Sequence, residues 1–162
     1  MSESQNELRG VTINVTGARL LLPNANVAEI ITFAEPEALP FPTPDWMLGR
    51  LRWRGGRLPL ISFSKLSGLA EREGELGAKV AVLRALGQAP RLPYFALLTQ
   101  GFPRLTTVAA DALIEYDDGE ALPVGARMRV MLRDDLALIP DLFDIEQRIL
   151  NVLAEEGASS AA

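Results

Sequence analysis

The residues of this sequence with the clearest capacity for binding chemistry are four arginines that lie close together. They are Arg50, Arg52, Arg54 and Arg57. Side chains alternate along a strand, so the first three would share one face, and Leu51 and Trp53 the other. A guanidinium pairs in a planar, bidentate way with carboxylates, and arginine is enriched at protein interfaces. The cluster predicts either a solvated strand face or a protein-binding surface, and Glu29 is its candidate partner within the chain.

Catalytic and metal-binding chemistry has few candidates here. The sequence contains no cysteine and no histidine, which removes thiolate nucleophiles, sulfur-ligated metals and the commonest general base. Two aspartate pairs fall in predicted turns, where aspartate accepts hydrogen bonds from nearby amides: Asp117 with Asp118, and Asp134 with Asp135. A small enzyme built on Asp111, Glu115 or Asp117 is the alternative, and it requires a pocket that gathers these groups. We expect no catalytic residue, no metal and no cofactor.

Net charge and hydropathy limit the partners and the location. The formal net charge of -5 repels nucleic acid and anionic lipid, and the arginine cluster has too few interleaved aromatic residues for a nucleic-acid surface. Residues 1–7 are polar and lack a secretory pattern, and no apolar run approaches the ~20 residues that span a bilayer. We predict a cytoplasmic protein that binds no nucleic acid and does not insert directly into a membrane.

The arginines must be positioned by short strands, which alternating apolar residues and turn signals predict throughout the first half. Gly55 and Gly56 tolerate positive φ and indicate a hairpin that carries the cluster. A proline-rich loop precedes this hairpin, and we expect it to be extended and ordered by packing. The predicted strands cover residues 9–15, 20–22, 27–33, 46–53 and 57–63.

The second half continues this pattern after a polar segment, residues 70–77, which predicts a solvated linker. Further strands are predicted at residues 79–86, 94–100, 105–109, 112–116, 127–132 and 136–139. Residues 141–153 predict a helix, because Asp141 can cap its start and apolar residues recur every three or four positions. Many short strands and one C-terminal helix predict an all-β barrel or sandwich, and the linker favours two similar subdomains.

Four motifs, taken in order, resemble the CheW-like family of chemotaxis coupling proteins. Residues 27–30 (Val-Ala-Glu-Ile) match V-x-E-I, and residues 44–49 match P-x-x-x-x-G. Residues 53–55 (Trp-Arg-Gly) are similar to the L-R-G turn, and residues 59–63 (Pro-Leu-Ile-Ser-Phe) to the P-I-x-D-L strand. Residues 136–150 resemble the final strand and helix of the family. No single motif is specific, but the ordered set is.

The resemblance implies two packed SH3-like five-stranded β-barrel subdomains and a non-enzymatic adaptor. Family members link a CheA-type histidine kinase to chemoreceptors, binding the kinase's CheW-like regulatory domain on one face and the receptor's cytoplasmic tip in a groove. A salt bridge between Glu29 and Arg54 is expected to fix neighbouring strands, and Gly49 to admit a partner helix. Together with the arginine cluster, six residues are predicted to bind partners or support an interface: Val27, Glu29, Gly49, Arg50, Arg52 and Arg54.

The implied organisation is a flexible N-terminus at 1–7, one CheW-like domain at 8–156 and a flexible tail at 157–162. Its subdomains would span 8–69 with the C-terminal helix, and 78–140. Two departures stand out: Ser62 replaces the family's aspartate, and residues 49–57 are unusually basic. They indicate an accessory member, such as a ChpC-type protein of a type IV pilus (twitching) system. A standalone β-barrel module that binds through its arginine-rich face is the open alternative.

Overall fold

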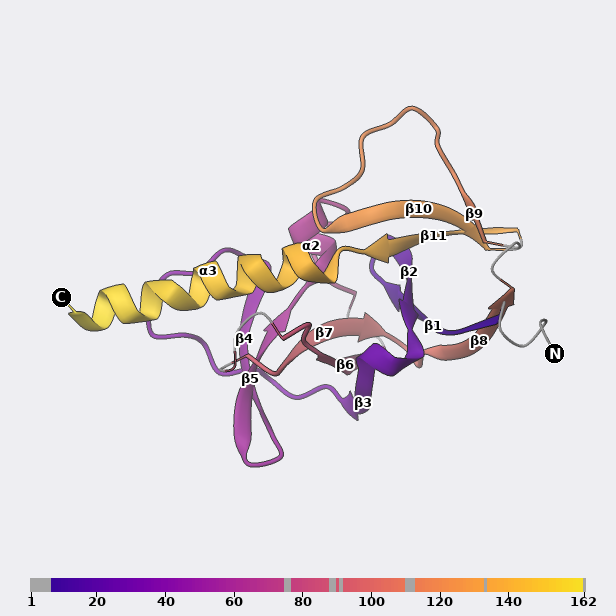
Figure 1. Ribbon diagram of the computed structural model, residues 1–162. Coiled ribbons are helices and arrows are strands. Elements are labelled where there is room, and N and C mark those ends of the chain that lie inside the picture. Colours follow the sequence, from indigo (N-terminus) through magenta and orange to yellow (C-terminus); the bar gives the residue numbers. More distant parts are fainter. Residues whose placement is uncertain are drawn as a thin grey trace.

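The computed structural model describes residues 7–74, 77–87, 90, 92–109, 113–132 and 134–161. Two curved β-sheets pack against each other, and a helix runs along one side (Figure 1). Each sheet presents apolar side chains at alternate positions toward the other, as the period-2 patterns require. The predicted segments 1–7 and 157–162 lie largely outside the described side chains, and Asp111 lies outside the described residues.

Sheet A has six strands in the order β8-β1-β2-β11-β10-β9. All its neighbours are antiparallel except β2 and β11, which run parallel with Leu20 opposite Leu138. Its strands are β1 (Glu7–Val15), β2 (Ala18–Pro23), β8 (Arg104–Ala109), β9 (Leu113–Glu115), β10 (Ala126–Leu132) and β11 (Asp135–Pro140). A small cluster around Leu21, Val130 and Ala137 fills its inner curve.

Sheet B has five strands in the order β3-β6-β7-β5-β4. It contains one parallel pair, β5 with β7, in which Leu60 lies opposite Ala96. A short 3-10 helix, η1 (Asn24–Asn26), leads into the sheet from β2. Its strands are β3 (Val27–Thr32), β4 (Met47–Trp53), β5 (Gly56–Ile61), β6 (Ala78–Arg84) and β7 (Tyr94–Gln100).

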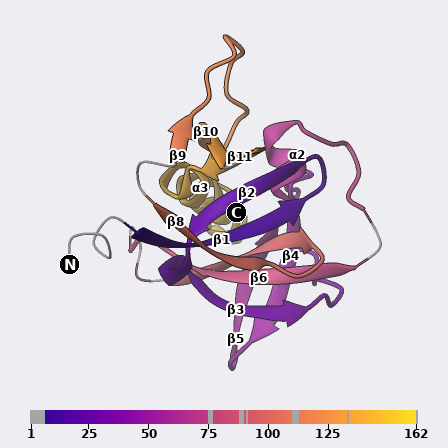
Figure 2. The same ribbon diagram turned by 90° about the vertical axis from the view of Figure 1, so that its right-hand side faces the viewer.

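The central strands of sheet B are buried on both faces, which explains their continuous apolar runs. Val80 and Val82 of β6 face the interior of the curved sheet, in a cluster with Leu51 and Leu98. The opposite face packs Leu83 and other apolar residues against sheet A and the C-terminal helix. Figure 2 shows β1 and β2 of sheet A lying over β3 and β6 of sheet B.

Within the described residues, two α-helices complete the fold. α2 (Phe63–Ser67) begins at Ser62, whose hydroxyl accepts from the Lys65 amide, and ends at Gly68 in the left-handed conformation. α3 (Leu142–Ala161) begins after Asp141, whose carboxylate accepts from the Asp144 amide at 3.0 Å as predicted. α3 continues past the predicted end at residue 153.

The predicted all-β fold with a C-terminal helix is confirmed, and each predicted strand overlaps an observed one. The sheets contain six and five strands, where five each were expected. Both sheets draw strands from both halves of the chain: β1 and β2 join sheet A, whereas β6 and β7 join sheet B. The division into subdomains 8–69 and 78–140 stays a prediction about folding units, distinct from these hydrogen-bonded sheets.

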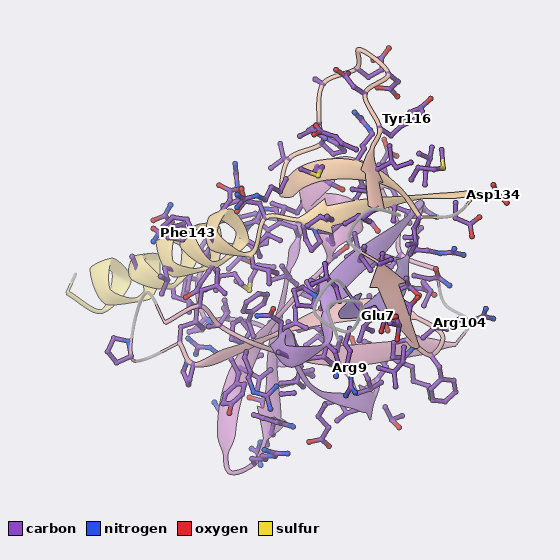
Figure 3. The ribbon with its side chains drawn as sticks, turned by 45° about the vertical axis from the view of Figure 1, so that its right-hand side comes forward. Glu7, Arg9, Arg104, Tyr116, Asp134 and Phe143 are labelled. Carbon is purple, nitrogen blue, oxygen red and sulfur yellow. The ribbon has the colours of Figure 1, made fainter. Side chains whose placement is uncertain are left out.

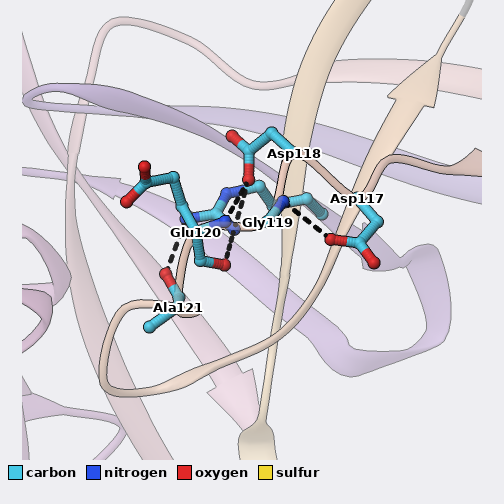
Figure 4. A network of polar contacts seen from close by, with 6 residues as sticks. Asp117, Asp118, Gly119, Glu120 and Ala121 are labelled. Carbon is cyan, nitrogen blue, oxygen red and sulfur yellow. Dashed lines mark hydrogen bonds and ion pairs between the residues drawn. The ribbon is translucent and has the colours of Figure 1, made fainter.

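The loop between β9 and β10 projects from the upper side of the molecule, and Tyr116 lies where β9 enters it (Figures 1 and 3). Arg129 holds the loop by donating to the carbonyls of Glu120 and Ala121 at 3.1 and 2.8 Å (Figure 4). The Asp117 carboxylate accepts from the Gly119 amide, and Asp118 accepts from Glu120. The predicted turn role of this aspartate pair is confirmed.

The two-sided burial of sheet B predicts an unequal response of two phenylalanines. Phe95 is fully buried between the sheets, whereas Phe102 is 74% exposed. Phe95→Ala should lower the free energy of unfolding by about 3–5 kcal/mol, because it removes a buried ring and leaves a cavity. Phe102→Ala, which loses only an exposed contact with Lys79, should lower it by less than about 1 kcal/mol. Urea unfolding measures both, and equal losses would contradict this placement of the core.

Candidate protein-interaction surface

The arginine cluster lies on the hairpin formed by β4 and β5, as predicted. Arg54 and Gly55 make the turn, with φ of +47° and +78°, the pattern of a tight two-residue hairpin loop. Arginine is an unusual residue there, because a side chain in the left-handed region costs roughly 1–2 kcal/mol. Arg54 is the only non-glycine residue with positive φ in the described part of the chain.

Glu29 meets this hairpin from the opposite edge of sheet B. Its Oε1 lies 3.1 Å from Arg54 Nη2 and accepts from Trp53 Nε1 at 3.2 Å. β3 and β4 are the two edge strands of the sheet, so these contacts require the sheet to roll until its edges approach. The predicted Glu29–Arg54 salt bridge is present, and it closes the rolled sheet.

Trp53 organises the side chains around this closure. The Arg54 guanidinium lies over the Trp53 ring, 4.5 Å from its centroid. Tyr94, the first residue of β7, contacts the same ring edge-on with centroids 4.8 Å apart. A cation on an aromatic face and an edge-to-face pair both favour this arrangement. Trp53 therefore sets the orientation of both partners of the salt bridge.

Glu37, in the proline-rich loop, neutralises part of the arginine cluster. Arg52 and Arg57 lie directly opposite each other across the hairpin, where like charges repel. The Glu37 carboxylate pairs with both, at 3.4 and 3.6 Å. Its backbone amide and carbonyl also bond those of Arg50, at 2.9 and 2.8 Å. The loop is thus ordered by packing and by this bridge, in agreement with the expectation for a proline-rich segment.

Gly49 permits a close approach within the chain itself. It has a φ of +142°, and a Cβ there would lie 2.4 Å from the Glu37 carbonyl oxygen and 2.9 Å from Pro36 Cβ. Sequence reasoning expected a partner helix in this space. In the structure the backbone of the proline-rich loop fills it, so Gly49 supports the surface from beneath by letting the loop cross β4.

A groove of about 400 Å³ runs beside the hairpin. Apolar residues of β5, of the segment before β7 and of α3 form its floor, including Leu58, Leu92 and Leu153. Arg50, Arg54 and Arg57 line its side. We call it the hairpin groove. An apolar floor with a guanidinium rim suits a protein segment that carries carboxylates beside an apolar side chain.

A second groove, of about 200 Å³, lies on the inner curve of sheet A. Its lining is almost wholly apolar and includes Leu8, Leu21, Val108, Leu113 and Ile139. Leu8 is 52% exposed at its mouth. We call it the sheet A groove. The two grooves share no residue and are built on different sheets.

The structure gathers most of the predicted site residues. Glu29 and Arg54 are in contact, Arg50 and Arg52 lie on the same hairpin, and Gly49 lies beneath it. Val27 is elsewhere: it packs against the core between the sheets, and its carbonyl accepts from Arg84 at 3.0 Å. Sequence reasoning missed the roles of Glu37, Trp53 and Tyr94. Trp53 and Arg54 are adjacent, and that pairing was the available signal.

The alternative carboxylate site is not assembled among the described residues. Glu115 is exposed on the edge strand β9, and Asp117 is engaged by its own turn. No group of three or more histidine, cysteine or acidic residues within the described ranges could hold a metal ion. Nor does any helix there have the length and apolar character to cross a membrane.

Comparisons with known proteins agree with this architecture. The CheW-like domain family matches residues 9–149, so the chain belongs to that family. Among solved structures, the scaffolding protein TtCheW from Thermoanaerobacter tengcongensis is similar with a TM-score of 0.69 and 16% sequence identity. The match covers 83% of this chain and 84% of that one, and shows a shared fold. No curated protein sequence matches significantly.

Alanine substitutions at three glycines of the β4–β5 hairpin distinguish the cost of steric crowding from the cost of backbone strain. Gly49→Ala should lower the free energy of unfolding by about 3 kcal/mol or more, because it has both positive φ and a blocked Cβ. Gly55→Ala has positive φ with nothing within 4 Å, so about 1 kcal/mol is expected. Gly56→Ala has neither problem and should change it by less than about 0.5 kcal/mol. Urea unfolding should rank the three losses of unfolding free energy in this order. If Gly49→Ala were tolerated, the proline-rich loop could not cross β4 as closely as described.

Arg54 should matter little for stability despite its salt bridge. The Arg54 and Glu29 side chains are 64% and 41% exposed, and exposed pairs contribute roughly 0.2–1 kcal/mol. Asparagine adopts the left-handed conformation more easily, so Arg54→Asn should leave the free energy of unfolding within about 0.5 kcal/mol. A double-mutant cycle of Arg54→Asn with Glu29→Gln measures the coupling energy between the two side chains. Glu29→Gln keeps an acceptor for the Trp53 indole N–H. A loss above about 2 kcal/mol for Arg54→Asn would make Arg54 a structural residue.

Proposed function

We propose that this chain is a non-catalytic adaptor that couples a CheA-type histidine kinase to the cytoplasmic tips of chemoreceptors. The observation that carries the proposal is the CheW-like domain, which extends over residues 9–149. The name of the similar structure describes a scaffolding protein. The protein would act in the cytoplasm and reach receptor arrays through its partners.

Coupling by an adaptor requires two surfaces that can be occupied together. The hairpin groove and the sheet A groove meet this requirement, because they lie on different sheets and share no residue. Simultaneous binding raises the effective concentration of kinase and receptor around each other. It also lets the bound state of one partner bias the other. The apolar core shared by the two sheets supports such linkage.

We also propose that this member serves an accessory pathway, such as the type IV pilus (twitching) system. The support is the composition of the hairpin. Three of its arginines, Arg52, Arg54 and Arg57, share two glutamates, Glu29 and Glu37, on a chain whose net charge is -5. Charge complementarity across an interface selects partners, so a distinct hairpin indicates distinct partners.

Partner binding is tested by co-elution of the chain with the kinase and a receptor-tip fragment encoded in the same genome. We expect a ternary complex from size-exclusion chromatography. Arg57→Glu, which reverses charge beside the hairpin groove, should weaken one binary complex by at least about tenfold and leave the other unchanged. Leu8→Asp, at the mouth of the sheet A groove, should do the reverse. Both residues are about half exposed, so folding should survive.

Matched control variants make the same types of substitution, arginine to glutamate and an apolar residue to aspartate, at positions outside both grooves. Arg127→Glu on β10 and Ile114→Asp on β9 alter exposed side chains that line neither groove. They should leave both complexes intact. Binding of one partner alone would favour the standalone interaction module, and loss of neither complex on combining Arg54→Ala with Glu29→Arg would count against the hairpin as a partner surface.

A further inference from the structure

Part of the segment predicted to be a solvated linker, residues 70–74, is tied to both sheets. Residues 70–74, which we call the strap, lead from α2 toward β6. The Glu73 carboxylate accepts from Thr16 Oγ1 at 2.7 Å and, through its other oxygen, from the Ser62 hydroxyl. Thr16 lies in the turn between β1 and β2 of sheet A, and Ser62 directly follows β5 of sheet B. One carboxylate therefore bridges the two sheets.

Neighbouring contacts hold the strap in the same place. The Gly74 amide donates to Thr16 Oγ1 at 3.0 Å, and Gln100, at the end of β7, donates to the Gly74 carbonyl at 3.2 Å. The Ser64 hydroxyl donates to the Thr16 carbonyl. Ser62 and Ser64 are completely buried, so their hydroxyls depend on these partners within the protein.

The chemistry of this cluster makes Glu73 its indispensable member. Thr16 accepts from Gly74 and donates to Glu73, and Ser62 accepts from Lys65 and donates to Glu73. Hydrogen bonds to an ionised acceptor are the strong ones. Without the carboxylate both hydroxyls lose their acceptor at once, on opposite sides of the seam between the sheets.

We propose that Glu73 is a positioning residue that clasps sheet A to sheet B and so sets the relative orientation of the hairpin groove and the sheet A groove. The clasp itself stands on the contacts above. Its consequence for coupling rests on the proposed function. A loosened clasp leaves each groove intact and lets the two move relative to each other.

The clasp is tested by a distance between the sheets in the whole chain. The sequence has no cysteine, so Thr32→Cys on β3 and Leu105→Cys on β8, both at exposed positions, give specific sites for spin labels. The wild-type background should show one narrow distance distribution. Glu73→Ala should broaden it, and Glu71→Ala, which removes an exposed carboxylate from the same strap, should not.

Amide exchange of Gly74 gives a second readout, with an expected acceleration of about tenfold or more in Glu73→Ala. A role swap makes the test specific. Ser62→Asp keeps a good helix cap but places a second carboxylate against Glu73, so it should broaden the distribution. Adding Glu73→Gln lets the amide donate to the new carboxylate and should restore the narrow distribution. If Glu73→Ala fails to fold, this pair carries the test.

The outcomes separate the clasp from the adaptor function. With Glu73→Ala, each binary complex with kinase or receptor should persist while the ternary complex weakens. A distribution that stays narrow in Glu73→Ala, or a double variant that is not restored, overturns the clasp whatever the chain binds. A broadened distribution in a chain that binds neither partner upholds the clasp and overturns the proposed function.

Discussion

The rolling of sheet B is the constraint on which the candidate surface depends. Its central strands are buried on both faces, so the sheet must curve to enclose one apolar cluster while its other face packs on sheet A. Curving brings the edge strands β3 and β4 together, and an edge with unpaired backbone groups needs cover. Glu29 meets Trp53 and Arg54 at this closure, and the proline-rich loop pairs with Arg50 of β4. The arginine hairpin is thus positioned by the way the sheet closes.

Most strands could be predicted from sequence because their signals are local. The alternation in β1 and the hairpin turn at Gly55 depend on residues that are close together in the chain. The parallel pairs were beyond such reasoning: Leu20 pairs with Leu138, and Leu60 with Ala96. The alternation of apolar residues within a strand does not specify which distant strand it pairs with. This is why the composition of the two sheets emerged only from the structure.

The candidate site divides in the same way. Glu29 and Arg54 could be paired because a known family arrangement supplied the long-range contact that the residues alone do not reveal. Glu37 and Glu73 lay in segments without periodicity, and each acts through residues distant in sequence, Arg57 and Thr16 among them. A solvated linker and a clasp have the same polar composition. A clasp differs from a linker because nearby hydroxyl groups need a hydrogen-bond acceptor. The hydroxyls of Ser62 and Thr16 are seen to lie beside Glu73 only in the folded structure.

The hairpin combines two features that oppose stability, and both favour the proposal that it is a partner-binding surface. A non-glycine residue occupies a left-handed turn position at Arg54, and Arg52 lies directly opposite Arg57. Asparagine or glycine would satisfy the turn, and opposite charges would satisfy the pair. Strain that the local fold does not require concentrates where side chains serve something outside it. Here Glu37 offsets the repulsion between Arg52 and Arg57, and Glu29 pairs with Arg54, beside a groove whose floor is apolar.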